Sequence, residues 1–144
     1  MELKIRIHRL HPDAVIPEYQ TKGSAAFDLA AADSVVVAPG EVRLVPTGLV
    51  IEVPAGMFLG IFARSSTPLK RGLMVANGVG VVDSDYRGPE DEVKIAVVNV
   101  TAKAVTIERG DRIAQGILLP APHVTWDEVD QVRSSSRGGF GATD

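Results

Sequence analysis

The chain has 144 residues, of which 45% are hydrophobic and 23% are charged, and its formal net charge is −3. This length suits one domain, and the charge argues against a general surface for nucleic acids or membranes. The lack of cysteine excludes disulfides and thiolate metal sites, and the histidines His8, His11 and His123 have no metal-ligand spacing.

The first ten residues, MELKIRIHRL, are too charged for a signal peptide. No apolar run along the chain approaches the ~18 residues that a transmembrane helix needs. We therefore expect a soluble, cytoplasmic protein that binds neither nucleic acid nor a membrane.

Short runs rich in valine and isoleucine follow one another along the chain, each bounded by proline, glycine or other turn residues. Such runs at this spacing are typical of strands in an all-β sandwich or barrel. We therefore predict an all-β domain over residues 1–130, followed by a flexible, glycine-rich arm over 131–144. The runs are 3–7, 34–40, 42–56, 57–63, 72–83, 93–100, 104–120 and 123–129.

Helix signals are poor and are concentrated in the segment STPLKRG, residues 66–72. Ser66 or Thr67 would cap a short helix, Pro68 suits its first turn, and Gly72 would end it. We expect one or two helical turns here.

The Asn-Gly pair at 77–78 lies between two apolar segments. This pair is a strong short-range hairpin signal, so we predict that residues 73–86 fold back on themselves.

Four polar clusters could carry chemistry, and the first two lie early in the chain. Asp28 stands in the apolar segment GSAAFDLAA, where a carboxylate either makes a structural hydrogen bond or is kept for a cation or substrate. By itself the segment favours the structural role. In ARSSTPLKRG, Arg64 offers a planar fork to phosphate, and Ser65 and Ser66 offer hydroxyls. A helix cap beside a surface arginine explains these residues equally well.

The third cluster is GVVDSDYRG, residues 80–88. On an extended segment Asp83 and Asp85 would share a face, with Tyr86 opposite Asp85. A carboxylate that holds a water is a sensible general base, although two aspartates at the end of a hairpin are also common.

The fourth cluster is RGDRIAQG, residues 109–116, in which Gln115 interrupts an apolar strand and needs a hydrogen-bond partner unless it faces solvent. The sequence contains no P-loop, nucleophile elbow or Rossmann glycine pattern.

Taken in order, the segments AAFDL, RSS, NGVGVVDSDYRG, GDRIAQ and RGGFGAT resemble the five motifs of the trimeric deoxyuridine triphosphate nucleotidohydrolases, or dUTPases. The resemblance runs from about residue 23 to the end. It implies a distorted jelly roll of the β-clip type that assembles as a homotrimer with active sites shared between subunits. It also implies Mg²⁺-assisted hydrolysis of dUTP to dUMP and pyrophosphate, which keeps uracil out of DNA and supplies the precursor of thymidylate.

The resemblance also assigns roles to residues. Asp83 would activate the water that attacks the α-phosphorus in line. Tyr86 would pack on the deoxyribose and exclude a 2′-hydroxyl, and the hairpin that begins at Asn77 would read uracil. Asp28 would hold Mg²⁺ through a water. The other substrate-binding residues implied are Arg64, Ser65, Ser66, Gly80, Val81, Val82, Lys94, Gln115, Arg137 and Phe140.

The arm departs from the usual pattern, because Ser135 occupies the position where an arginine is usual, five residues before Phe140. Phe140 would stack on uracil, and either Arg137, which we favour, or Arg133 would grip the γ-phosphate. The segment YRGPEDEVKI also carries about three extra residues, 89–91, which we expect to form a surface bulge.

Two alternatives remain at this point. A dCTP deaminase has a related fold and shares an RSS segment, but the segment DSDYRG and the glycine-rich arm favour a dUTPase. A non-enzymatic β-trimer that acts as a binding module is the second alternative. It would be expected to have lost catalytic residues that this chain retains.

Overall fold

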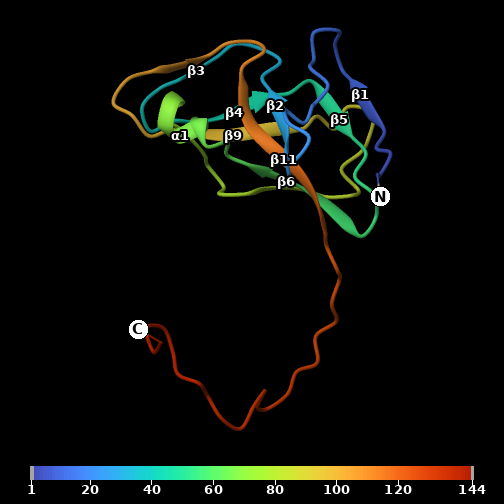
Figure 1. Ribbon diagram of the computed structural model, residues 1–144, viewed down its shortest axis with the longest axis vertical. Helices are drawn as coiled ribbons and strands as arrows, with labels where there is room; N and C mark the ends of the chain where they lie inside the picture. The colour runs from blue at the N-terminus through green and yellow to red at the C-terminus, as the bar shows by residue number, and fades with distance from the viewer. Residues whose placement is uncertain (1, 144) are drawn as a thin grey trace.

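The computed structural model describes residues 2–143. It shows a body of short strands from which the C-terminal segment projects as a long, extended chain (Figure 1). The elements described are β1 (Ile7–Arg9), β2 (Phe27–Ala30), β3 (Val35–Val37), β4 (Val42–Pro46), β5 (Leu49–Ile51), β6 (Met57–Phe62), α1 (Ser66–Arg71), β7 (Leu73–Val75), β8 (Gly80–Val82), β9 (Lys94–Asn99), β10 (Val105–Ile107) and β11 (Arg112–Pro120).

The strands form small antiparallel sheets. The largest has the order β2-β11-β6-β8, and a three-stranded sheet has the order β4-β9-β7. Two further pairs join β1 to β5 and β3 to β10. The all-β fold predicted from the sequence is confirmed, with one short helix as its exception among the described residues.

The core forms because side chains alternate along these strands. In β9, Ile95 and Val97 are fully buried, whereas Ala96 and Val98 face the other side of the sheet. Burial of each such aliphatic side chain stabilises the fold by about 1.5–3 kcal/mol. The other large, fully buried side chains are Leu29, Leu49, Leu59, Leu73, Ile107, Ile113, Val37, Val45, Val53 and Val93.

The predicted hairpin over residues 73–86 is wrong, although its turn is present. The Gly78 N–H donates to the Val75 carbonyl at 3.0 Å, and Gly78 has a φ of 73°. However, β7 pairs with β9 while β8 pairs with β6, so the two strands belong to different sheets. The Asn-Gly pair therefore marks a change of sheet, because turn chemistry sets where a chain bends and not which strand it then joins.

The expected strands at the two ends of the chain also differ from the structure. Of residues 3–7 only Ile7 lies in a strand, and residues 123–129 form none. Val124 and Trp126 are exposed, and Trp126 is 91% accessible. An isolated segment with no neighbouring strand cannot pair its backbone groups, so an apolar pattern alone does not make it a strand.

The helix is short, as predicted, but its start differs. Ser65 occupies the N-cap position without a side-chain capping hydrogen bond, so the predicted caps at Ser66 and Thr67 are wrong. The Thr67 hydroxyl instead accepts the Arg64 N–H at 2.9 Å and donates to the Ile113 carbonyl at 2.9 Å, which ties the helix to β11. Gly72 ends the helix with a φ of 66°, as expected. Within residues 2–143, no helix is both long enough and apolar enough to cross a bilayer.

Candidate functional site

One group of polar residues gathers where β2, β11 and β6 lie side by side. Gln115 on β11 is the register partner of Asp28 on β2 and of Phe62 on β6, and Arg64 follows two residues after Phe62. Three of the sequence-predicted clusters, around Asp28, Arg64 and Gln115, are therefore brought together. We call Asp28, Arg64, Ser66, Arg112 and Gln115 the arginine cluster.

Asp28 is the centre of the arginine cluster. The residue is only 9% exposed, and its Oδ1 lies 3.1 Å from the Arg64 Nε. Its Oδ2 lies 3.4 Å from the Arg112 Nη1 and has no hydrogen-bond partner. A buried carboxylate needs compensation of its charge, and two guanidinium groups supply it here.

Arg64 is held from several directions. Its Nη1 donates to the Arg112 backbone carbonyl at 2.9 Å and lies 3.4 Å from the Ser66 hydroxyl oxygen. Its backbone N–H is bound by Thr67. Ser65 is exposed at the helix start. These contacts fix the guanidinium in place, so that its remaining donors can bind an anion without first being ordered.

Gln115 has a hydrogen-bond partner, which decides against the solvent-facing alternative. Its side-chain nitrogen donates to the Ala63 carbonyl at 3.0 Å. This bond joins β11 to the segment that carries Arg64. The residues predicted to bind phosphate are therefore held by the same part of the sheet.

A second group follows β8. Asn77 is exposed in the turn before this strand, and Val81 is exposed between buried Gly80 and Val82. Asp83 is exposed directly after the strand. We call Asn77, Gly80, Val81, Val82, Asp83 and Tyr86 the β8 group.

Residues 83–86 form a turn in which the Tyr86 N–H donates to the Asp83 carbonyl at 3.2 Å. The expectation that Asp83 and Asp85 share the face of an extended segment is therefore wrong. A turn reverses the chain before the alternation of a strand can place the two carboxylates on one side.

The extra residues 89–91 form the expected surface turn. The Asp91 carboxylate accepts the Gly88 N–H at 2.8 Å, and the Glu92 carboxylate accepts the Gly48 N–H at 2.8 Å. The Tyr86 hydroxyl donates to the Glu92 carbonyl at 2.9 Å. Glu92 directly follows the insertion, and its bond to the predicted sugar-facing tyrosine could not be foreseen from the sequence.

The arginine cluster and the β8 group lie apart within one chain. Strands β6 and β8 are antiparallel, with Val82 opposite Leu59 and Gly80 opposite Ile61. Asp83 therefore lies near the start of β6, whereas Arg64 lies beyond its end, a separation of about 20 Å at the usual rise of a strand. Lys94 begins β9 in the other large sheet, and Arg137 and Phe140 lie in the projecting segment.

Arg112 is a member of the arginine cluster that sequence reasoning missed. The register of β11 against β2 shifts between Arg112 and Ala114, which marks a β-bulge. Ile113 and Ala114 are both fully buried, so the bulge returns Arg112 and Gln115 to the same side of the sheet. The two consecutive apolar residues Ile113 and Ala114, directly before the polar Gln115, are the sequence signal that could have revealed it.

A small ion-pair network lies beside the β8 group. Glu52 accepts hydrogen bonds from the Arg6 Nη2 at 3.0 Å and from the Arg87 Nη1 at 3.2 Å. The hydrogen bond from Arg6 lowers the pKa of the Glu52 carboxyl, with smaller contributions from the charges of Arg6 and Arg87. The same bond raises the pKa of Arg6. Through Glu52, this network links the residue before β1 to the segment that follows the Asp83 turn.

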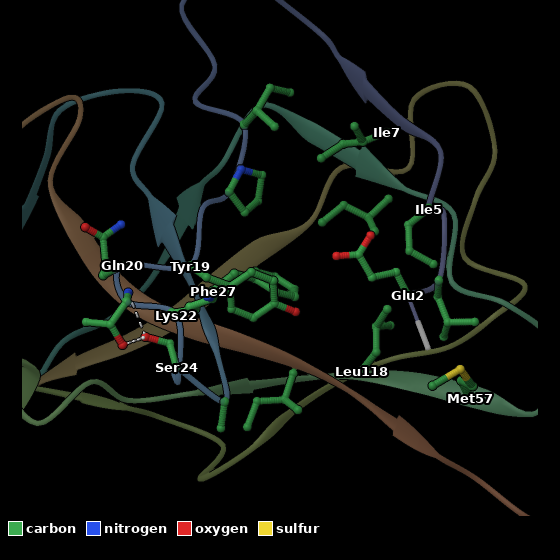
Figure 2. Close-up of a pocket in the computed structure, with 17 residues that line it drawn as sticks. Glu2, Ile5, Ile7, Tyr19, Gln20, Lys22, Ser24, Phe27, Met57 and Leu118 are labelled. Carbon is green, nitrogen blue, oxygen red and sulfur yellow. Dashed lines mark hydrogen bonds between the residues drawn. The ribbon is translucent and has the colours of Figure 1, made fainter.

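A cavity lies elsewhere, and its lining is more apolar than polar. It has a volume of about 950 Å³, and its lining includes Ile5, Tyr19, Phe27, Met57 and Leu118 (Figure 2). The rings of Tyr19 and Phe27 pack edge to face, with centroids 5.8 Å apart. None of the predicted site residues lines this cavity. It is therefore separate from the predicted nucleotide site.

The residues present limit how a metal could be held. Within the described part of the chain, no group of three or more histidine or acidic side chains could enclose an ion. The unpartnered Asp28 Oδ2 could accept a hydrogen bond from a metal-bound water. The donor set thus fits Mg²⁺ held mainly by a phosphorylated ligand, because that ion retains its waters.

An all-β body that presents two arginines, hydroxyls and an amide around a buried carboxylate defines a protein suited to phosphorylated ligands. A family model described as dUTPase matches residues 13–144. The chain is 43% identical to the deoxyuridine 5'-triphosphate nucleotidohydrolase of Wolinella succinogenes, over 99% of this chain and 95% of that protein. It is 41% identical to the protein of the same name from Helicobacter pylori (strain J99), over 98% and 97%. The chain belongs to the dUTPase family, which decides against the dCTP deaminase alternative.

Solved structures agree with this assignment. The crystal structure of a dUTPase from Streptococcus mutans has a TM-score of 0.77 and 31% identity, covering 85% of this chain and 98% of that chain. The Staphylococcus bacteriophage 80alpha dUTPase with dUPNHPP shares the fold, with a TM-score of 0.86 at 23% identity over 98% of each chain. The dUTPase of phage phi11 of S. aureus, described with a structural Mg(II) ion, has a TM-score of 0.79 at 20% identity, over 90% and 99%.

Proposed function

We propose that this chain hydrolyses dUTP to dUMP and pyrophosphate, with the arginine cluster as the triphosphate site and Asp83 as the general base. As a member of the dUTPase family the chain is a nucleotide hydrolase. The observation that carries the residue assignment is the convergence of Arg64, Ser66 and Gln115 around buried Asp28. Guanidinium, hydroxyl and amide groups together bind phosphate oxygens and neutralise the charge that develops on the leaving pyrophosphate.

Asp83 acts as the general base. Its exposed position after β8 leaves the carboxylate open to a water molecule and a ligand. An ionised carboxylate that accepts a proton from this water raises its nucleophilicity toward the α-phosphorus, and in-line attack then expels pyrophosphate.

The turn and strand before Asp83 recognise the base, and Tyr86 after it recognises the sugar. The Asn77 amide and the backbone of residues 80–82 pair with the edge of uracil, and cytosine would leave buried groups unpaired at a cost of roughly 1–3 kcal/mol each. The ring of Tyr86 packs on the deoxyribose and leaves no room for a 2′-hydroxyl. Its hydrogen bond to Glu92 supports this role by holding the ring in one place.

The distance between the arginine cluster and the β8 group within one chain supports active sites that are shared between subunits. A triphosphate chain is far shorter than the ~20 Å of strand that separates Asp83 from Arg64 in one chain. A site that uses both residues is completed by taking the β8 group from one subunit and the arginine cluster from another. This arrangement fits a homotrimer, in which three identical sites lie at subunit boundaries.

An unpartnered apolar face supports the same assembly. On the outer side of the sheet β4-β9-β7, Val42 and Met74 flank Val98, and Leu44 lies beside Ala96. Val42, Leu44 and Met74 are each at least half exposed in the single chain. A contiguous apolar face of this kind is suited to burial against other copies of the chain. Exposed Lys94 begins the central strand of the sheet and would approach a nucleotide held by a neighbour.

The projecting segment and the apolar groove complement one another. Val124, Trp126, Val129 and Val132 are exposed on a segment that leaves the body after β11 (Figure 1). The groove in Figure 2 offers an open apolar surface of matching chemistry. We assign the groove to the projecting segment of a second copy, which would bury Trp126 and carry residues 131–144 to that neighbour. Phe140 would then cover the uracil, and Arg137 or Arg133 would bind the γ-phosphate.

Magnesium is the proposed cofactor. When bound to the triphosphate it would neutralise phosphate charge, and Asp28 would orient one of its waters through Oδ2. The remaining steps belong to residues of the chain: Arg64 and Gln115 orient the phosphates, and Asp83 takes the proton from water.

The function is tested with purified protein, Mg²⁺ and dUTP, dCTP, dTTP or UTP in separate reactions. The expected result is one pyrophosphate and one dUMP for each dUTP consumed, with at most slow turnover of the other nucleotides. Release of ammonia from dCTP, or failure to produce pyrophosphate from dUTP, would overturn the proposal.

A further inference from the structure

We infer that Glu92 is a positioning residue for sugar discrimination, because it connects the ring of Tyr86 to the buried body of the fold. The inference rests on the proposed function, in which this ring excludes a 2′-hydroxyl, and it identifies the residue that keeps the ring in place. Glu92 lies where an exposed segment meets the core: Tyr86 is 42% exposed, whereas Val93 is 1% exposed.

The peptide unit between Glu92 and Val93 has a fixed direction. Its N–H, which belongs to Val93, donates to the Leu49 carbonyl at 2.8 Å. The peptide is trans, and in a trans peptide the N–H and the C=O point in opposite directions. The Glu92 carbonyl is therefore turned away from Leu49, and there it accepts the Tyr86 hydroxyl at 2.9 Å. Two hydrogen bonds in line through one peptide polarise it in the same sense and strengthen each other.

The buried side of this connection is rigid. Thr47, Leu49 and Val93 are all buried. The Thr47 hydroxyl donates to the Val93 carbonyl at 2.6 Å and accepts the Leu49 N–H at 3.3 Å. Buried groups with such bonds resist displacement, because moving them would leave a polar atom unpaired. Leu49 thus offers the Val93 N–H an acceptor in a fixed place.

The side chain of Glu92 holds the same residue from a second direction. Its Oε2 accepts the Gly48 N–H at 2.8 Å in a part-buried hydrogen bond. Gly48 is itself confined, because a Cβ built on it would lie 2.8 Å from the His11 Nε2 and 2.9 Å from the Ala14 Cβ. Its carbonyl also accepts the Leu10 N–H at 2.8 Å. The Glu92 carboxylate is therefore anchored to backbone that has little room to move.

The insertion before Glu92 gains much of its hold on the body through this side chain. The insertion is closed mainly on itself: the Asp91 carboxylate accepts the Gly88 N–H at 2.8 Å, and the Asp91 N–H donates to the Gly88 carbonyl at 3.2 Å. Arg87 forms another tie, a hydrogen bond to Glu52 at 3.2 Å, but this pair lies at the surface, where ion pairs contribute little. The part-buried bond of Glu92 is the firmer tie.

Loss of this anchor would act on the ring of Tyr86. If the Glu92 peptide can shift, the hydroxyl that it holds shifts with it, and a displaced ring leaves space for a 2′-hydroxyl. Because dUTP and UTP differ at this one position of the sugar, the effect falls on the choice between them. General damage to the fold would instead lower kcat/KM for both nucleotides alike.

The experiment compares the ratio of kcat/KM for dUTP to that for UTP in the wild type and in variants of Glu92. Glu92→Ala should lower this ratio by roughly twofold to tenfold, the range expected when about one hydrogen bond is lost. Glu92→Gln keeps a side-chain oxygen for the Gly48 N–H and should retain most of the preference. Glu90→Ala is the matched control, because it removes one carboxylate from the same exposed segment, and its ratio should equal that of the wild type.

A double-mutant cycle shows whether Glu92 acts through the Tyr86 hydroxyl. In a Tyr86→Phe background this hydroxyl is absent, so Glu92→Ala should lower the ratio clearly less than it does in the wild type. Equal fold-losses in the two backgrounds would overturn the positioning role. If thermal unfolding shows that Glu92→Ala does not fold, the cycle is run with Glu92→Asp, whose shorter side chain should bind Gly48 less well.

The two levels of the argument fail in different ways. A wild type that hydrolysed UTP as readily as dUTP would remove the proposed sugar role of Tyr86, and the role of Glu92 with it. A wild-type preference for dUTP that a folded Glu92→Ala variant fully preserved would overturn the inference alone.

Discussion

The Tyr86 hydroxyl donates a hydrogen bond of 2.9 Å to the Glu92 backbone carbonyl. Glu92 is itself tied to Gly48, and the turn before it is closed by Asp91. The extra residues 89–91 thus belong to a braced segment that fixes the ring proposed to face the sugar. The insertion therefore lies in the segment that holds the ring proposed to face the sugar.

Removal of this brace should affect sugar discrimination more than catalysis. Tyr86→Phe keeps the ring but loses a hydrogen bond worth about 0.5–1.5 kcal/mol, so we expect the preference for dUTP over UTP to fall by a few-fold to tenfold. Tyr86→Ala removes the ring and should lower this preference further. The ratio of kcat/KM for the two nucleotides measures both effects. An unchanged ratio in Tyr86→Ala would show that the ring does not exclude the 2′-hydroxyl.

Asp83→Asn should lower kcat for dUTP by at least ~100-fold, because an amide cannot take the proton from the attacking water. Binding of a non-hydrolysable analogue should remain within a few-fold of the wild type. Asp85→Asn is the matched control in the same turn and should retain most of the turnover. Near-normal kcat in Asp83→Asn would refute the general-base assignment.

Two inactive variants should restore activity when they assemble together. Asp83→Asn damages the β8 group and Arg64→Gln damages the arginine cluster, so mixed assemblies would contain some sites with both groups intact. Random mixing of equal amounts should return about a quarter of the wild-type rate if each site combines two subunits. Co-expression with two affinity tags and a pyrophosphate assay measures this. No recovery in verified mixed assemblies would place both groups of each site in a single subunit.

Truncation after Ser136 should leave folding and assembly intact but lower turnover strongly, because Arg137 and Phe140 would be lost from the closing arm. Circular dichroism, size-exclusion chromatography and kinetics on one preparation separate these effects. Arg137→Ala should reduce activity more than Arg133→Ala. The reverse order would assign the γ-phosphate to Arg133, and an unaffected truncated protein would mean that the arm has no catalytic role.

The Glu52 network predicts a pH dependence of stability. Because the folded-state pKa of Glu52 lies below the ordinary value of 4.5, its contribution is fully present above that value and is lost as the pH falls through the folded pKa. The difference in urea midpoint between the wild type and Glu52→Gln should therefore be constant near neutral pH and shrink in acid. The difference should be small, since the pair is at the surface. A difference that grew in acid would contradict the assignment.

Local features of the structure could be predicted well from the sequence. Gly72 ends the helix because its αL conformation suits glycine, and Gln115 has a partner because a polar group in an apolar strand needs one. The family could also be predicted, because five short motifs occur in a fixed order. These signals depend on a few neighbouring residues, so they can be recognised without knowledge of the tertiary fold.

Long-range pairing could not be predicted in the same way. The turn at 77–78 is present, yet its two strands join different sheets. Residues 123–129 pair with no strand within residues 2–143. The approach of Arg112 to Asp28 depends on a bulge, which changes the side that every preceding residue faces. For the turn and for the bulge, the decisive partner lies far away in the sequence.

The antiparallel register of β6 and β8 would also have a genetic consequence. Under the shared-site arrangement, each subunit contributes Asp83 to one active site and Arg64 to another. A substitution in one subunit would therefore affect an active site that a second subunit helps to form. A damaged allele would then impair products of a healthy allele in the same cell. Selection on this gene would act on the mixture of copies present, and not on each polypeptide separately.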